Sequence, residues 1–187
     1  MAFRTPPHGH VDEAALDIAV RLLTNNFGSG KLDSISNNGD ALMATAMTAA
    51  LKDAGITFVA GVPSLPFGSR KKLMRRCMEQ VDKVKNGDFG DSDLQALKME
   101  AGRELKRKLE DADKRGWMMV EAYGNGEDSW AEYLASEQAV ENVSRDDVMR
   151  VARKYFNNEY MDFVKKYGSY PSDKVSQPGY KPCLQRT

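Results

Sequence analysis

The sequence predicts an α+β fold, in which an antiparallel β-sheet has its helices packed on one face. Two neighbouring apolar runs, 41–50 and 56–62, have the pattern of a β-hairpin. Several amphipathic helix patterns follow them, and a strand pattern at 160–166 comes last. Strands and helices that occupy separate parts of a chain are typical of α+β domains. Two or three strands are few to support so many helices, so either further strands lie in segments without a pattern or the domain is truncated in this chain.

The N-terminal segment, residues 1–11, is expected to be a disordered lead-in, because it is rich in Pro, Gly and His and has no apolar periodicity. Order is predicted to begin near Asp12. From there apolar residues recur every three or four positions, which predicts a helix that ends at Gly28. The apolar positions of this helix are Leu16, Ala19, Val20, Leu23 and Phe27.

The runs 41–50 and 56–62 are separated by a short polar segment that ends in Gly55, and this spacing predicts an antiparallel hairpin. A turn is predicted before the first strand, because Asn-Asn-Gly at 37–39 is typical of turns. The first run is rich in Ala and Met, so its strand pattern is weaker than that of the second run.

Two long helices are predicted after the hairpin. Ser69 is expected to be the N-cap of the first, and Asn-Gly at 86–87 is its stop signal. The second is predicted to begin with a capping box between Ser92 and Gln95 and to run toward Gly116. The apolar stripes are Leu73, Met74, Cys77, Met78, Val81 and Val84 in the first helix, and Leu94, Leu97, Ala101, Leu105 and Leu109 in the second.

Two shorter helices are predicted before the last strand, with the serine N-caps Ser129 and Ser144. The tail at 169–187 holds three prolines and has no periodicity, which predicts an extended interdomain linker. The sequence therefore divides into a lead-in at 1–11, a domain at 12–168 and a linker at 169–187.

Charge and hydropathy exclude several classes of partner. The 27 Lys and Arg residues balance 27 Asp and Glu residues, so the chain lacks the basic field that attracts nucleic acid or an anionic membrane surface. The apolar stretches are shorter than the roughly 20 residues that a membrane span needs. We expect a soluble domain, and the sequence leaves open whether its compartment is a bacterial periplasm or the cytoplasm.

The segment 27–32, Phe-Gly-Ser-Gly-Lys-Leu, resembles the end of a phosphate-binding loop. It departs from that motif at two positions. Asn25 stands where the first glycine is needed, and Leu32 stands where a Ser or Thr would bind magnesium. We therefore expect an ordinary loop that follows a helix.

His8, His10 and Glu13 form a cluster of metal-ligating residue types, but their spacing matches no zinc site. Neither H-E-x-x-H nor H-x-x-E-H occurs in the chain. Both histidines are expected to be solvated residues of the lead-in. With only two histidines in the sequence, little general-base chemistry is available.

The remaining candidates also have plainer interpretations. Ser69 and Lys72 match S-x-x-K, although a helix cap explains the serine. The carboxylates Asp88, Asp91 and Asp93 lack the register of a calcium loop and are expected at a helix start.

Apolar side chains and cysteines complete the set of candidates. Four aromatic residues are expected to fill the core rather than to line a peptide groove, namely Trp117, Tyr123, Trp130 and Tyr133. Cys77 and Cys183 form no disulfide framework, and Cys77 is expected in the core. No residue of this chain is predicted to be catalytic, to bind a cofactor or to ligate a metal.

The order of the segments resembles the noncatalytic second domain of the pitrilysin/insulinase family of zinc metallopeptidases, also called inverzincins. The similar segments cover most of the chain: a helix and small-residue bend at 12–32, a strand pair at 41–62, a helix closing on Val-Lys-Asn-Gly-Asp-Phe at 84–89, and an acidic-start helix at 91–114. The most specific is 143–156, Val-Ser-Arg-Asp-Asp-Val-Met-Arg-Val-Ala-Arg-Lys-Tyr-Phe, which is similar to the family pattern V-T-x-x-D-V-x-x-x-A-x-K-Y.

This resemblance implies a fold like that of the mitochondrial processing peptidase and a role as a noncatalytic, chamber-forming domain of a zinc metalloendopeptidase that degrades peptides. Zinc is then expected in a separate catalytic domain, in the same polypeptide or in a partner subunit, and not in this chain. The family also has an Arg and a Tyr that hold substrate, but Ser36 and either Leu42 or Met43 align there, so that function does not carry over.

The resemblance also implies strands before Asp12, where the sequence shows none, so we expect this chain to be part of a longer polypeptide. The alternative function is a stand-alone protein-binding scaffold module with the same fold and no peptidase activity. An independent hydrolase that uses Ser69 or the histidines is disfavoured.

Overall fold

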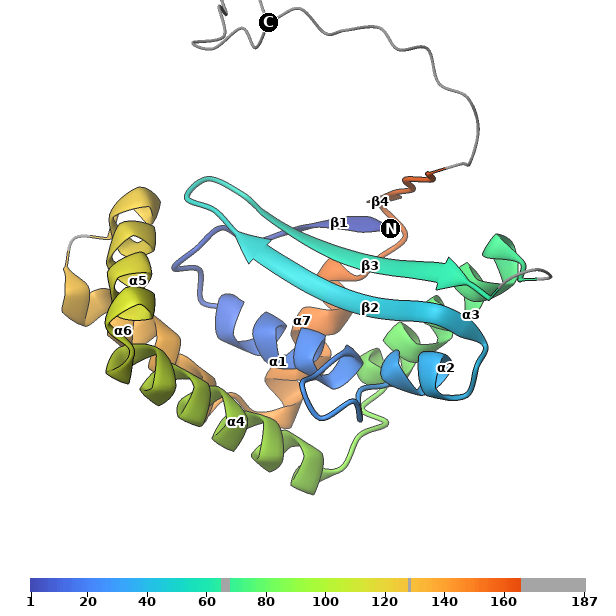
Figure 1. Ribbon diagram of the computed structural model, residues 1–187, viewed down its shortest axis with the longest axis horizontal. Coiled ribbons are helices and arrows are strands. Elements are labelled where there is room, and N and C mark those ends of the chain that lie inside the picture. The colour runs from blue at the N-terminus through green and yellow to red at the C-terminus, as the bar shows by residue number, and fades with distance from the viewer. Residues whose placement is uncertain (65–67, 128, 166–187) are drawn as a thin grey trace, which may run out of the picture.

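The computed structural model describes residues 1–64, 68–127 and 129–165. Figure 1 shows a single layer of strands with helices gathered on one side of it, which confirms the predicted α+β class. The elements in order are β1 (Ala2–Thr5), α1 (Glu13–Leu23), α2 (Asp33–Asn37), β2 (Ala41–Ala50), β3 (Gly55–Pro63), α3 (Arg70–Lys85), α4 (Asp91–Glu110), α5 (Ala112–Asn125), α6 (Trp130–Gln138), the 3-10 turn η1 (Ala139–Asn142), α7 (Arg145–Tyr155) and β4 (Tyr160–Met161).

The sheet has four strands in the order β2-β3-β1-β4, and every neighbouring pair is antiparallel. The predicted hairpin is confirmed as β2 and β3, whose register pairs Met47 with Phe58. Strand β1 lies between β3 and β4, with Ala2 opposite both Phe58 and Met161. The N-terminal residues therefore form an interior strand of the sheet.

The prediction of a disordered lead-in at 1–11 is wrong. The side chain of Phe3 is fully buried and meets the ring of Phe156 edge-on at 5.4 Å. Beyond the strand, the N–H of His8 donates to the carbonyl of Leu51 at 3.0 Å. A strand of four residues is too short to show alternation, and its partners in β3 lie fifty or more positions away in the sequence. Its order thus comes from tertiary pairing, and it supplies one of the strands expected in a segment without a pattern.

The main core lies between the sheet and the helices α1, α3 and α7. Small residues of β2, Ala44 and Ala46, face these helices together with Val59 of β3. Each fully buried Val, Leu or Ile side chain contributes about 1.5–3 kcal/mol relative to exposure. The helical side chains with no exposed surface are Ile18, Ala19, Leu23, Val81, Val84, Val148, Val151 and Ala152.

The helix predicted to run from Ser92 toward Gly116 is two helices, α4 and α5. Asp111 interrupts it, because its backbone is extended and its carboxylate accepts from the N–H groups of Asp113 (3.1 Å) and Lys114 (3.2 Å). An aspartate that binds two free N–H groups begins a new helix instead of continuing the old one.

The three predicted serine N-caps are confirmed, whereas the predicted end of the first helix at Gly28 is wrong, because α1 ends at Leu23 and Phe27 is exposed. Ser69, Ser129 and Ser144 each accept from the N–H three residues later, as predicted. The capping box at Ser92 is wrong, because α4 begins earlier. Its N-cap is Gly90, whose N–H donates to the Asp93 carboxylate at 2.9 Å.

A second, smaller core lies at the end of the molecule away from α3, where α5 and α6 pack on the last turns of α4 (Figure 1). Leu105, Met118, Ala122 and Tyr133 are buried there, and Trp130 packs against them. This region forms a satellite of the main domain.

The last strand is shorter than predicted. Of the segment 160–166, Tyr160 and Met161 pair with β1, while 162–165 have no regular structure. The predicted linker at 169–187 lies outside the described residues and stays a prediction.

Candidate functional site

The sheet face opposite the helices is open and largely apolar, with the exposed Arg4 of β1 as a charged residue on it. Side chains alternate along β2 and β3, so residues between the helix-facing positions point to this other face. The exposed fractions are 55% for Met47 and 65% for Met161, and the register aligns both in one row with Phe58 and Ala2 across all four strands. Met43 and Val62 extend the surface and are 45% and 43% exposed. Among the described elements, the helices pack on the opposite face (Figure 1).

The free edge of the sheet is partly closed by two hydroxyl groups. The N–H of Ala44 donates to Ser36 Oγ at 2.8 Å, and the N–H of Ala46 donates to Thr24 Oγ1 at 2.9 Å. Both N–H groups belong to β2, the edge strand, where an added strand would otherwise bind them. Ser36, which the resemblance aligns with the family's arginine, therefore satisfies one N–H group of the sheet edge. Leu42 and Met43, one or the other of which the resemblance aligns with the family's tyrosine, are exposed apolar residues.

The glycine-containing loop at 27–32 does not present a phosphate cradle. Its N–H groups donate internally: Gly28 to the Asn25 carbonyl, Ser29 to Asn25 Oδ1, Gly30 to Asp33 Oδ2, and Lys31 to the Leu22 carbonyl, at 2.9–3.3 Å. A backbone donor that is already bonded is not free to bind an anion. The expectation of an ordinary loop is confirmed.

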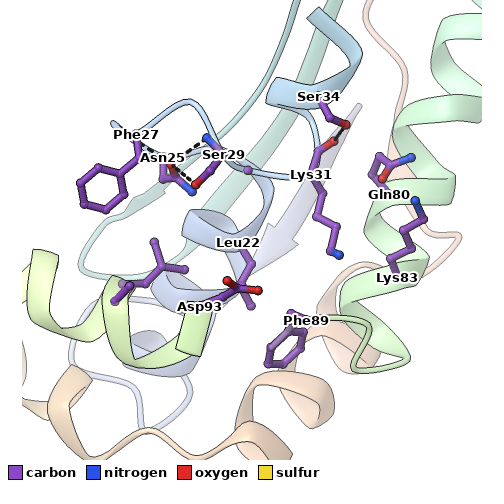
Figure 2. A pocket seen from close by; sticks show the side chains of 13 residues that line it. Leu22, Asn25, Phe27, Ser29, Lys31, Ser34, Gln80, Lys83, Phe89 and Asp93 are labelled. Atoms are coloured by element: carbon purple, nitrogen blue, oxygen red, sulfur yellow. Dashed lines mark hydrogen bonds between the residues drawn. The ribbon is translucent and has the colours of Figure 1, made fainter. Parts of the chain in front are cut away.

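This loop borders an open pocket of about 310 Å³ between α1, α3 and the start of α4. Figure 2 shows Lys31 from the loop and Lys83 from α3 on the same side of the pocket, with Phe89 below them. The Lys31 ammonium lies 3.9 Å from the Asp88 carboxylate. The polar groups at this pocket thus include charges of both signs, and they do not define a single class of ligand.

The two histidines are not the solvated tail residues that were expected. The His8 side chain is 8% exposed, and its Nδ1 and Nε2 each lie 2.9 Å from a carboxylate oxygen, of Glu13 and Glu127 respectively. Two acceptors on opposite sides of one ring do not converge on a common point. The His10 Nδ1 accepts from the N–H of Asp12 at 3.0 Å.

Within the described ranges, no three His, Cys, Asp or Glu side chains are grouped so as to hold a metal ion. The acidic residues Asp91 and Asp93 near the start of α4 already have hydrogen-bond partners in the protein. Asp91 binds Arg145 at 2.9 Å, and Asp93 caps the helix. Ser69 is likewise a helix cap, so its hydroxyl has a structural partner.

Among the residues that the structure describes, Asp12 is the carboxylate with the least exposed surface, and sequence reasoning missed its role. Its side chain is 2% exposed and accepts from Arg150 (2.6 Å), Lys154 (2.7 Å) and Tyr155 (2.8 Å). Burial alone would raise the pKa of Asp12, but the hydrogen bonds from Lys154, Arg150 and Tyr155 outweigh burial and hold this pKa well below its usual range. The cluster joins the start of α1 to the end of α7.

The aromatic residues divide into two groups. Tyr133 is buried and stacks on Trp130 with 5.4 Å between ring centroids, as expected of core residues. The expectation is wrong for Trp117 and Tyr123, which are 73% and 88% exposed on α5. Helix α5 begins after its N-cap Asp111 and ends before its C-cap Gly126. Its buried residues are Met118 and Ala122, so the two exposed aromatic residues lie on its other side.

Cys77 lies in the core, as predicted, and is 2% exposed. Burial raises the pKa of its thiol to about 11. A thiol with a raised pKa is a poor nucleophile at neutral pH, because the reactive form is the thiolate.

Comparison with known proteins identifies the fold. No family model matches the sequence, and no curated protein sequence matches it. A protease from Helicobacter pylori superimposes with a TM-score of 0.74 at 22% identity, over 83% of this chain and 37% of that one. The inactive peptidase domain of a proposed zinc protease from Bordetella parapertussis gives 0.73 at 20% identity, over 85% of both chains. A proposed M16-like peptidase from Alicyclobacillus acidocaldarius gives 0.58 at 17% identity, over 78% and 33%.

The chain thus has the fold of M16-like peptidase domains. It spans about a third of the Helicobacter protease and most of the inactive Bordetella domain. In the part of the chain that the structure describes, no helix is both long enough and apolar enough to cross a membrane.

Proposed function

We propose that this chain is a noncatalytic domain of a zinc metalloendopeptidase of the pitrilysin/insulinase family, and that its open sheet face forms part of the wall of a chamber for peptide substrates. The observation that carries the proposal is the apolar row of Met47, Phe58 and Met161, uncovered by described elements, in a fold shared with peptidase domains. Zinc belongs to a separate catalytic domain, in the same polypeptide or in a partner subunit.

The chemistry of this face fits an unfolded peptide. Apolar side chains on an exposed sheet face bind other apolar side chains without requiring a particular sequence. The hydroxyl groups of Thr24 and Ser36 occupy two N–H groups of the β2 edge, so the face is a more accessible surface for a peptide than that part of the edge. Met43 and Met47 favour broad specificity, since methionine side chains adapt to differently shaped partners.

Fluorescence anisotropy with a labelled, extended apolar peptide tests this proposal on the purified chain. We expect weak, saturable binding that Phe58→Glu reduces at least about tenfold, because a carboxylate on the face costs more than about 1.4 kcal/mol of binding free energy. Met47→Glu should act in the same way. Trp117→Ser is the matched control, because it removes an exposed aromatic residue outside this face.

The result of the control separates the two candidate functions. Loss of binding in Phe58→Glu with wild-type binding in Trp117→Ser supports the chamber wall. If the Phe58 and Met47 variants bind the peptide as tightly as the wild type does, the open face is not a peptide surface. The scaffold alternative would then gain support from the exposed apolar face of α5.

A further inference from the structure

The outer face of α5 exposes large apolar side chains along its length. Trp117 is 73% exposed, Val120 59% and Tyr123 88%, whereas Met118 and Ala122 on the opposite side are buried in the satellite core. Positions three apart on a helix lie on the same face, so these three exposed residues form one surface. Exposed large apolar side chains that share one helix face are characteristic of protein–protein interaction sites.

The sequence of this surface is symmetric about Val120. Glycines stand four positions before and after it, at Gly116 and Gly124, and aromatic residues stand three positions before and after it, at Trp117 and Tyr123. Two such helices that pack antiparallel about a twofold axis at Val120 place each aromatic residue opposite an aromatic residue and each glycine opposite a glycine. Self-complementarity of one patch is the requirement for an isologous interface.

The two glycines make close approach possible. A Cβ added at Gly116 or at Gly124 would meet no atom within 4 Å, so the space beside each glycine is open. Both glycines lie in the helix and have no positive φ that would require glycine for the backbone conformation. These two glycines therefore do not serve a turn. Because they have no side chain, they leave room on the helix surface. A large aromatic ring from a second helix fits beside such a position.

We propose that α5 is a homodimerisation surface, on which a second copy of this chain binds through its own α5 in an antiparallel arrangement. The helix of 14 residues is about 21 Å long. Its exposed aromatic, Val and Met side chains bury on the order of 400 Å² per copy, which is about half of the 800 Å² per partner of a standard interface. The dimer is therefore weak and forms at micromolar or higher concentration.

Sedimentation velocity across a concentration series tests this dimer with the full chain. We expect a monomer below about 10 µM and a dimer that predominates toward about 500 µM, as a weak interface of this size requires. Val120→Glu should abolish the dimer, because it places a charge on the twofold axis in each copy. Met47→Ser is the control and should leave the dimer unchanged, since Met47 lies on the open sheet face.

A second variant separates dimer loss from misfolding. Gly116→Gln combined with Gly124→Gln fills the groove at both glycines and also improves helix propensity. We expect this variant to raise the melting temperature of the monomer and yet to weaken the dimer at least about tenfold. A wild-type chain that stays monomeric at about 500 µM, or a glutamine variant that dimerises as the wild type does, overturns the proposal.

Discussion

At the scale of single residues, Asp12 shows how a charge is stabilised inside this fold. Three donors from α7 surround a carboxylate that is 2% exposed. The sequence predicts that order begins near Asp12, but it does not predict this cluster, because Arg150 and Lys154 lie 138 and 142 positions away. Their pattern on α7 is that of an ordinary charged helix face. The partner becomes evident only when α1 and α7 pack together.

We expect Asp12→Asn to lower the free energy of unfolding by about 1–3 kcal/mol at neutral pH, because it removes the charge of a buried carboxylate that accepts three hydrogen bonds. Urea unfolding measures this change. Asp53→Asn, an exposed residue of the hairpin connection, is the matched control and should change stability little.

The same cluster predicts a pH dependence. The pKa of Asp12 is lowered in the folded state, so its contribution is complete above the unfolded value of 3.8 and is lost as the pH falls below that value. The stability difference between wild type and Asp12→Asn should therefore shrink on acidification. A difference that stays constant from pH 7 to about pH 2.5 would mean that the Asp12 charge does not stabilise the fold.

At the scale of elements, local signals predicted the fold well and long-range pairing did not. The serine caps at Ser69, Ser129 and Ser144 were predictable because each side chain binds an N–H three residues away. Strand β1 was not predictable from the sequence, since four residues carry no periodicity. This strand is ordered by its pairing with β3. The sequence also did not predict which face of the sheet is exposed, because this depends on which side of the hairpin the helices cover. Trp117 and Tyr123 are exposed on α5, a separate helix that begins after Asp111. The apolar periodicity of the sequence does not show this break between α4 and α5.

The edge of β2 yields a prediction at this scale. We expect Thr24→Ala combined with Ser36→Ala to lower the free energy of unfolding by about 1–3 kcal/mol, because two strand N–H groups lose their acceptors. The variant should also aggregate more readily, since an unpaired edge can add strands from other molecules. Thermal unfolding and light scattering measure both effects.

Thr45→Ala is the control for this variant, because Thr45 lies on the open face and Ala60 stands opposite it. It removes a threonine hydroxyl from the same strand without touching the edge. If the control and the double variant unfold and aggregate alike, the hydroxyl groups do not protect the edge.

At the scale of the whole molecule, a fold of peptidase domains is combined with side chains that do not assemble a metal site in the described residues. His8 and Glu13 belong to the cluster of metal-ligating residue types in the sequence, and the structure gives the physical reason why they do not suit a metal site. The two carboxylates beside His8 lie against different ring nitrogens: Glu13 is hydrogen-bonded to Nδ1, whereas Glu127 lies 2.9 Å from Nε2 without the geometry of a hydrogen bond.

Calorimetric titration of the metal-free full chain with zinc at neutral pH tests the noncatalytic role most directly. We expect no zinc binding tighter than about millimolar, because no set of three ligands converges on one point among the described residues. Stoichiometric binding at about micromolar affinity that His8→Ala removes would contradict it, since His8 and its carboxylates would then form a metal site in this domain.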